Sequence, residues 1–96
     1  MTQELIEIIN SVKAEFTDDS DLLWTSYSSA IQAREELDKY VNQLRQGDQS
    51  CLKELQVHFW PSCTFQEHAL MNGWSAKYLK LAEEFDHIYA KVKNHK

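Results

Sequence analysis

The sequence predicts an all-α fold: a small antiparallel helical bundle with three longer helices and two short ones, in one domain over residues 1–96. Apolar residues recur at steps of three and four along three long segments, which is the spacing of one helical face. No strand-like run alternates with period two beyond a few positions, and no glycine-rich hairpin signal is present. With 43% hydrophobic residues, the chain has enough apolar material for one core.

The first expected helix spans about residues 2–16. Leu5, Ile9, Val12 and Phe16 are spaced four, three and four residues apart, and Thr2 can cap the helix start. The polar cluster of residues 17–21 contains no apolar side chain, so it predicts a short turn into the next helix.

The second expected helix is long and runs from Leu23 to Gly47, where a glycine suits the left-handed backbone that ends many helices. Arg34 interrupts its apolar stripe. We interpret Arg34 as a residue at the edge of the stripe, whose head reaches water or pairs with a local acid such as Asp38. The alternative is a buried anion-binding group.

Two short helices are expected in the middle of the chain. The first must end near Trp60, because Pro61 disfavours helical backbone in the residue before it. The second opens with the capping box formed by Thr64 and Glu67 and closes around Gly73.

The last segment has the most regular period. Its apolar residues step four, three, four, three and four along the chain: Trp74, Tyr78, Leu81, Phe85, Ile88 and Val92. The three long stripes can only be buried against each other, which favours a bundle with the short pair crossing one end or filling a gap. A coiled-coil dimer is the alternative, but each seam lasts only about three heptads.

Charge and composition exclude several classes of protein. A net charge of −5 makes a nucleic-acid partner improbable, because such proteins need a surplus of basic residues. No segment has the roughly 20 apolar residues of a membrane span, and the N-terminal residues lack the basic start of a signal peptide. We therefore expect a cytoplasmic protein without a membrane partner. Cys51 and Cys63 are expected to be free thiols, with Cys51 more shielded.

Patterns that indicate chemistry are weak. Glu84 and His87 have the Glu-x-x-His spacing that di-iron bundles use twice, but it occurs once, and Glu54 and His58 share a face of the third helix. Cys63 lies near a helix start, where a thiol pKa can fall. We expect no catalytic residue, no cofactor and no metal site, and a protein that is not an enzyme. The alternative is a metal- or thiol-dependent bundle that uses His58, Cys63, His68 or the pair Glu84 and His87.

The segment from His58 to Trp74 concentrates aromatic residues around the only proline. Aromatic anchors carry much of the energy at protein interfaces, so we expect a non-enzymatic interaction module that binds a protein partner or a second copy of itself. The acidic charge suits a basic partner. The expected binding residues are Trp60, Pro61, Phe65, Glu67 and Trp24. The competing interpretation is that Phe59, Trp60, Phe65 and Trp74 seal the core of the bundle.

In size, charge and class alone, the chain resembles small acidic helical bundles that bind a partner, including bacteriocin- and toxin-immunity proteins. The resemblance implies partner binding. It assigns no role to any residue.

Overall fold

A computed structural model of the chain describes residues 2–23, 25, 27–60 and 63–94. This part contains five α-helices and no strand, so the predicted all-α class is confirmed. None of these helices combines the length and the apolar run that crossing a bilayer requires. The helices are α1 (Thr2–Lys13), α2 (Ala30–Arg45), α3 (Leu52–Phe59), α4 (Thr64–Asn72) and α5 (Ser75–Asn94).

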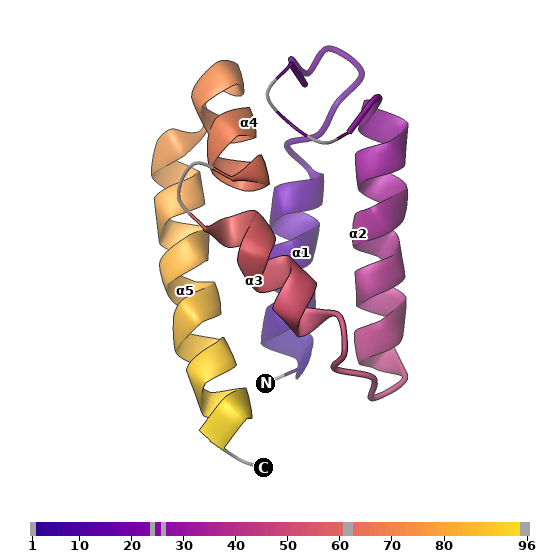
Figure 1. Ribbon diagram of the computed structural model, residues 1–96, viewed down its shortest axis with the longest axis vertical. Coiled ribbons are helices and arrows are strands. Elements are labelled where there is room, and N and C mark those ends of the chain that lie inside the picture. The colour runs from indigo at the N-terminus through magenta and orange to yellow at the C-terminus, as the bar shows by residue number, and fades with distance from the viewer. Residues whose placement is uncertain (1, 24, 26, 61–62, 95–96) are drawn as a thin grey trace.

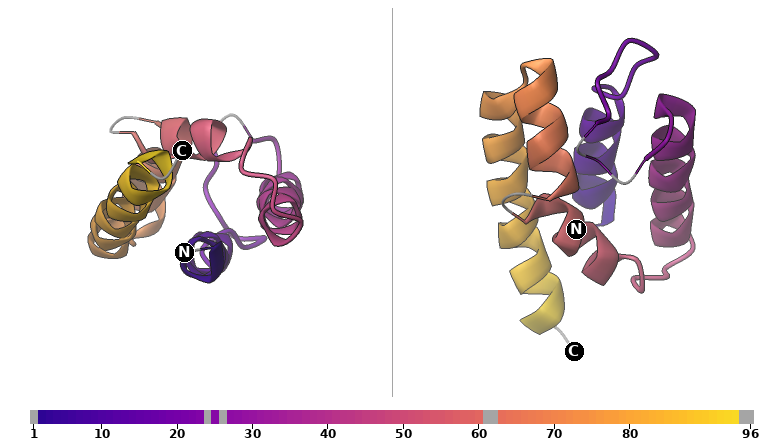
Figure 2. Two further views of the ribbon diagram at one scale, coloured as in Figure 1. Left: turned by 90° about the horizontal axis from the view of Figure 1, so that it is seen from below. Right: turned by 45° about the horizontal axis from the view of Figure 1, so that its top comes forward.

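Helix α1 lies between α2 and α5 and runs in the opposite direction to both (Figure 1). Helix α3 crosses in front of α1 at a steep angle, and α4 lies along the first half of α5 (Figure 2). Helix α5 thus packs against α1, α3 and α4. The short helices close the side of the α1, α2 and α5 frame that faces the viewer in Figure 1.

The core is formed by the predicted helical stripes. All six apolar residues of the last predicted stripe, from Trp74 to Val92, are buried. Helices α1 and α2 each contribute a further row of buried apolar side chains. On α1 the row includes Leu5, Ile9 and Val12, and these residues pack into the same core as Leu37 of α2. The expected inner faces of α1 and α5 are therefore confirmed.

The expected end of the first helix is wrong by three residues. Helix α1 ends at Lys13 rather than Phe16, and the backbone N–H groups of Glu15 and Phe16 bond three residues back, as in a tightened last turn. The Ser20 hydroxyl donates to the Glu15 carbonyl at 3.2 Å and accepts from the Thr17 N–H at 2.9 Å. Phe16 is nevertheless buried, because the turn carries its ring into the core.

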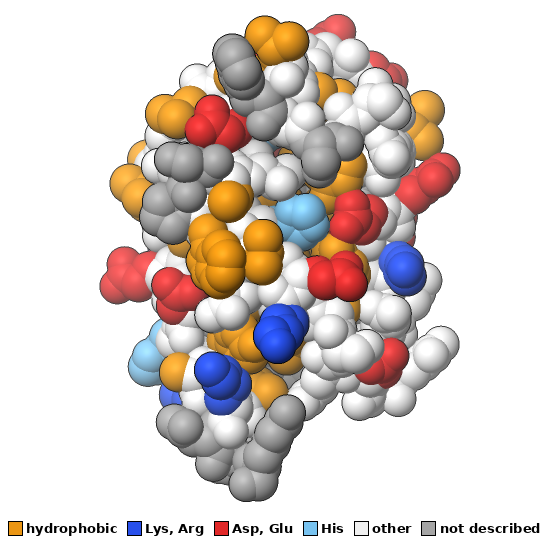
Figure 3. Space-filling model, in the orientation of Figure 1, with side chains coloured by type: hydrophobic (Ala, Val, Ile, Leu, Met, Phe, Trp, Pro, Cys, Tyr) orange, Lys and Arg blue, Asp and Glu red, His pale blue; other side chains and the backbone are white. Residues whose placement is uncertain are grey.

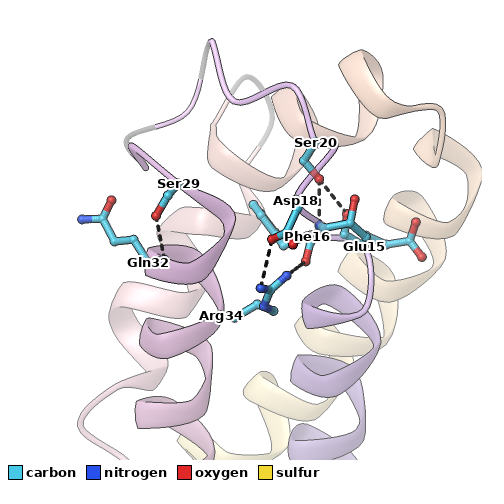
Figure 4. A network of polar contacts seen from close by, with 8 residues as sticks. Glu15, Phe16, Asp18, Ser20, Ser29, Gln32 and Arg34 are labelled. Carbon is cyan, nitrogen blue, oxygen red and sulfur yellow. Dashed lines mark hydrogen bonds and ion pairs between the residues drawn. The ribbon is translucent and has the colours of Figure 1, made fainter.

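The expected start of the second helix is also wrong. Helix α2 begins at Ala30, and Leu23 is 74% exposed instead of contributing to a stripe. Ser29 has extended backbone and its side chain accepts from the Gln32 N–H at 3.1 Å, so it caps the helix (Figure 4). The Thr25 hydroxyl donates to the Leu22 carbonyl. Serine and threonine side chains compete for backbone hydrogen bonds in this way, which explains why the helix starts late.

The short helices have nearly the expected boundaries. Helix α3 ends at Phe59, and Gly73 follows α4 with a positive φ of 81°, as predicted. The interpretation of Thr64 as a cap is wrong. Thr64 is the first residue of α4, and its hydroxyl lies 3.0 Å from Nδ1 of His58 instead of capping the helix.

Candidate functional site

The predicted partner-binding residues divide into four groups. Trp24 and Pro61 lie outside the described residues, while Glu67 on α4 is half-buried. Trp60, directly after α3, is 50% exposed, and its backbone N–H donates to the carbonyl of Val57, which is itself 42% exposed. Trp60 and Val57 are exposed apolar residues three positions apart at the end of α3, and we refer to this pair as the α3 surface.

Phe65 belongs to the core, which corrects the expectation that it is an exposed anchor. Its side chain is 0% exposed. Its ring centroid lies 4.8 Å from that of Phe59, 5.3 Å from that of His58 and 6.3 Å from that of Phe16. A ring enclosed by three others has no surface to offer a partner. The competing interpretation, that aromatics seal the bundle, therefore holds for Phe65, as it does for the buried Phe59 and Trp74, whereas Trp60 is half exposed.

A half-buried polar cluster joins α2, α3 and α4 around His58. Its Nδ1 lies 3.0 Å from Oγ1 of Thr64, and its Nε2 lies 3.3 Å from Oε1 of Glu36. The Tyr40 hydroxyl donates to Glu36 and also lies 3.2 Å from Oε2 of Glu54. In the space-filling view of this face, a histidine side chain lies beside two acidic ones (Figure 3).

The cluster keeps its carboxylate ionised and its phenol protonated. Partial burial alone would raise the pKa of Glu36, but the Tyr40 hydrogen bond and the nearby His58 outweigh it and lower the pKa. Burial and the hydrogen bond to Glu36 raise the pKa of Tyr40. The i,i+4 spacing of Glu54 and His58 was visible in the sequence, but the contribution of Tyr40 depends on how α2 packs, so sequence reasoning missed it.

The His58 imidazole links the Thr64 hydroxyl to the Glu36 carboxylate. Enzymes with a hydroxyl nucleophile use the same sequence of hydroxyl, base and orienting carboxylate. Catalysis further requires space for a substrate next to the hydroxyl. The grooves between α1 and α5 and beside α3 and α5 are lined by other residues. The contacts that the structure shows form a polar tie between α2, α3 and α4.

His68 is a buried histidine with a structural role. Its ring stacks on Phe16 with centroids 3.9 Å apart, and its Nδ1 accepts from Nε1 of Trp74 at 2.8 Å. Accepting at Nδ1 places the proton of the neutral ring on Nε2, which has no hydrogen-bond partner in the described part of the chain. Burial lowers the pKa of His68 to about 4. The ring is therefore neutral at physiological pH.

Arg34 has different partners from those expected. Its guanidinium donates to the Phe16 carbonyl at 2.7 Å and to Oδ1 of Asp18 at 3.4 Å (Figure 4). The expected acid, Asp38, instead pairs with Lys13 at 2.6 Å. Arg34 thus ties the end of α1 and the following loop to α2. Its hydrogen bonds to the protein itself do not support the alternative of an anion-binding group.

The thiols and the possible metal ligands are dispersed. Cys51 is buried and Cys63 is half-buried, as expected, and both are free. Burial raises the pKa of the Cys51 thiol. Glu84 and His87 are exposed on α5. Among the described residues, no three His, Cys, Asp or Glu side chains are grouped so that they could hold a metal ion.

Comparisons of this chain with protein-family models, with curated proteins and with solved structures found no match. The described residues form an all-α structure in which Trp60 is exposed and His58, Thr64 and Glu36 form a half-buried polar tie.

Proposed function

We propose that this chain is a non-enzymatic interaction module that binds a partner protein through the α3 surface. The exposure of Trp60 is the observation that supports this most strongly. Among the Phe, Trp and Tyr side chains that the structure describes, Trp60 alone is exposed, and the others are buried or partly buried. Half of this large side chain therefore remains in water, three residues after the exposed Val57.

The energy that this surface can contribute to binding comes from its apolar area. An indole ring is among the largest apolar groups that a side chain can offer, and tryptophan is enriched among residues whose truncation costs about 2 kcal/mol or more of binding. Val57 extends the apolar area by one turn of α3. Trp60 provides the anchor in this proposal, and Val57 helps to exclude water around it.

The charge of the chain indicates the kind of partner. At −5, two copies repel each other, whereas a basic protein is attracted and steered toward the surface. A basic partner is therefore favoured over a second copy. We also propose a cytoplasmic location, because both cysteines are free thiols, as is usual in a reducing compartment.

The test uses the tagged full chain and two matched variants, Trp60→Ala and Leu79→Ala. Leu79 lies on α5 and is 63% exposed, so its truncation removes an exposed apolar side chain elsewhere. We expect the parent and Leu79→Ala to retain the same basic partner after cross-linking in cells, and Trp60→Ala to lose it. Retention by all three proteins would contradict the proposal. Concentration-dependent sedimentation of the parent, abolished by Trp60→Ala, would assign the surface to a second copy instead.

A further inference from the structure

A groove of about 350 Å³ lies between α1 and α5, away from the α3 surface. The two helices neighbour each other and run in opposite directions (Figures 1 and 2). Each contributes residues spaced three or four apart, so both rows line the same depression. The lining residues are Glu4, Glu7, Ile8 and Ser11 from α1 and Leu81, Glu84, His87 and Ile88 from α5.

The groove has an apolar floor and an acidic rim. Ile8, Leu81 and Ile88 are buried at the edge of the core, whereas Glu7 and Glu84 are exposed on opposite helices. This combination suits a long side chain with an aliphatic stem and a cationic head. The stem would lie on the floor and the head would reach the carboxylates.

The rim residues Glu7 and Glu84 share the groove with His87 and with Glu4, which is not without a partner. Glu7 and Glu84 have no ion-pair partner among the described residues. Lys13, Arg34 and Lys77 pair with acids outside the groove. Lys80 lies beside Glu84 in a neighbouring hollow without an ion pair to it. Two carboxylates that line the same groove repel each other, and a cation placed between them removes that repulsion.

We propose that this groove binds an arginine or lysine side chain from a cationic segment of the partner protein. The inference rests on the proposed function, because it assigns the partner a second contact and a chemistry. An arginine fits best, since its planar guanidinium can bond both carboxylates while its stem covers Ile8 and Ile88. A second copy of this chain is a poorer occupant, because it carries the same net charge of −5.

The test measures binding of a defined probe: an amphipathic helical peptide of about 15 residues, built from Leu, Ala and Arg. The control peptide has Glu in place of each Arg. We expect saturable binding of the Arg peptide alone, with amide NMR shifts concentrated on α1 and α5. In Glu7→Gln combined with Glu84→Gln, the affinity should fall at least about tenfold, because both charge-assisted contacts are lost.

The matched control combines Asp19→Asn with Glu35→Gln, which removes two exposed charges outside the groove. Its affinity should stay within about threefold of the parent, since only long-range attraction is reduced. Equal losses in both double variants, or shifts centred elsewhere, would overturn the groove as the site. Binding of the Arg peptide that requires added zinc, or no binding at all, would overturn it too.

The two proposals fail separately. If Trp60→Ala abolishes partner association while the Arg peptide does not bind, the groove inference is wrong and the proposed function stands. If the peptide binds the groove but Trp60→Ala leaves partner association unchanged, the α3 surface is wrong. Circular dichroism on each variant checks that the helices are retained.

Discussion

At the scale of single residues, His68 links the core to the pH of the solution. Its neutral ring stacks on Phe16 and accepts a hydrogen bond from Trp74. A positive charge on this ring would have no carboxylate within hydrogen-bond distance in the described part of the chain. Protonation is therefore unfavourable in the folded state and unhindered in the unfolded state. The sequence alone places this histidine on α4 but does not show its burial.

The pKa of His68 predicts a loss of stability in acid. Between its ordinary value of 6.5 and the folded value of about 4, the unfolded chain binds a proton that the folded chain does not. The free energy of unfolding should therefore fall as the pH decreases through this range, by about 3 kcal/mol at most. Urea unfolding at several pH values measures this, and His68→Gln should remove that part of the slope. The same slope in His68→Gln as in the parent would contradict the assignment, and His87→Gln serves as the exposed control.

The two thiols should differ in reactivity. Cys51 is buried and its pKa is raised, whereas Cys63 is half-buried before α4. Because the thiolate is the reactive form, a thiol reagent should label Cys63 before Cys51 in native conditions. Mass spectrometry of the labelled chain over time checks the order. Equal rates would show that the N-terminal end of α3, where Cys51 lies, opens as readily as the turn that contains Cys63.

At the scale of helices, the polar tie around His58 substitutes for apolar packing between α2 and α3. Tyr40→Phe removes the hydroxyl that donates to Glu36 while keeping the ring. The loss should be about 1–2 kcal/mol of unfolding free energy, because a hydrogen bond to a charged group is broken. Tyr89→Phe, which also removes a phenolic hydroxyl, is the matched control and should have little effect. Chemical denaturation that gives equal losses for both variants would show that the tie contributes nothing.

The burial of Phe65 gives a second prediction for these helices. Phe65→Ala should cost about 3–5 kcal/mol, since it leaves a cavity among Phe16, His58 and Phe59. Such a loss is a large fraction of the roughly 5–15 kcal/mol that stabilises a domain. Thermal unfolding measures it. A melting temperature equal to that of Leu79→Ala would place Phe65 on the surface after all.

At the scale of the whole molecule, the helices with a regular apolar stripe could be predicted from the sequence, whereas the paths of the loops between them could not. The stripe of α5 and the stop at Gly73 follow from spacing and backbone geometry alone. The late start of α2 depends on serine and threonine hydroxyls bonding to backbone, which a hydrophobic pattern does not register. The pairing of Arg34 with Asp18 depends on the path of that loop.

The candidate sites show the same division. The sequence indicated that the aromatic segment from His58 to Trp74 could bind a partner. Which of its rings faces water depends on how α3 and α4 pack, and the structure exposes Trp60 and buries Phe65. Helix α4 has only nine residues, too few for its period to distinguish an inner face clearly. The groove between α1 and α5 joins residues more than 60 positions apart in the sequence, so only the fold brings Glu7 and Glu84 together.

The most direct test of the central claim is the affinity of the isolated partner for the parent chain and for Trp60→Ala, measured by calorimetry. If Trp60 is an interface anchor and not part of the core, the affinity should fall by about 30-fold or more, which corresponds to about 2 kcal/mol. The unfolding free energy of the variant should change by less than about 0.5 kcal/mol, as for other surface truncations. An unchanged affinity would contradict the account, and so would a loss of stability as large as that of Phe65→Ala.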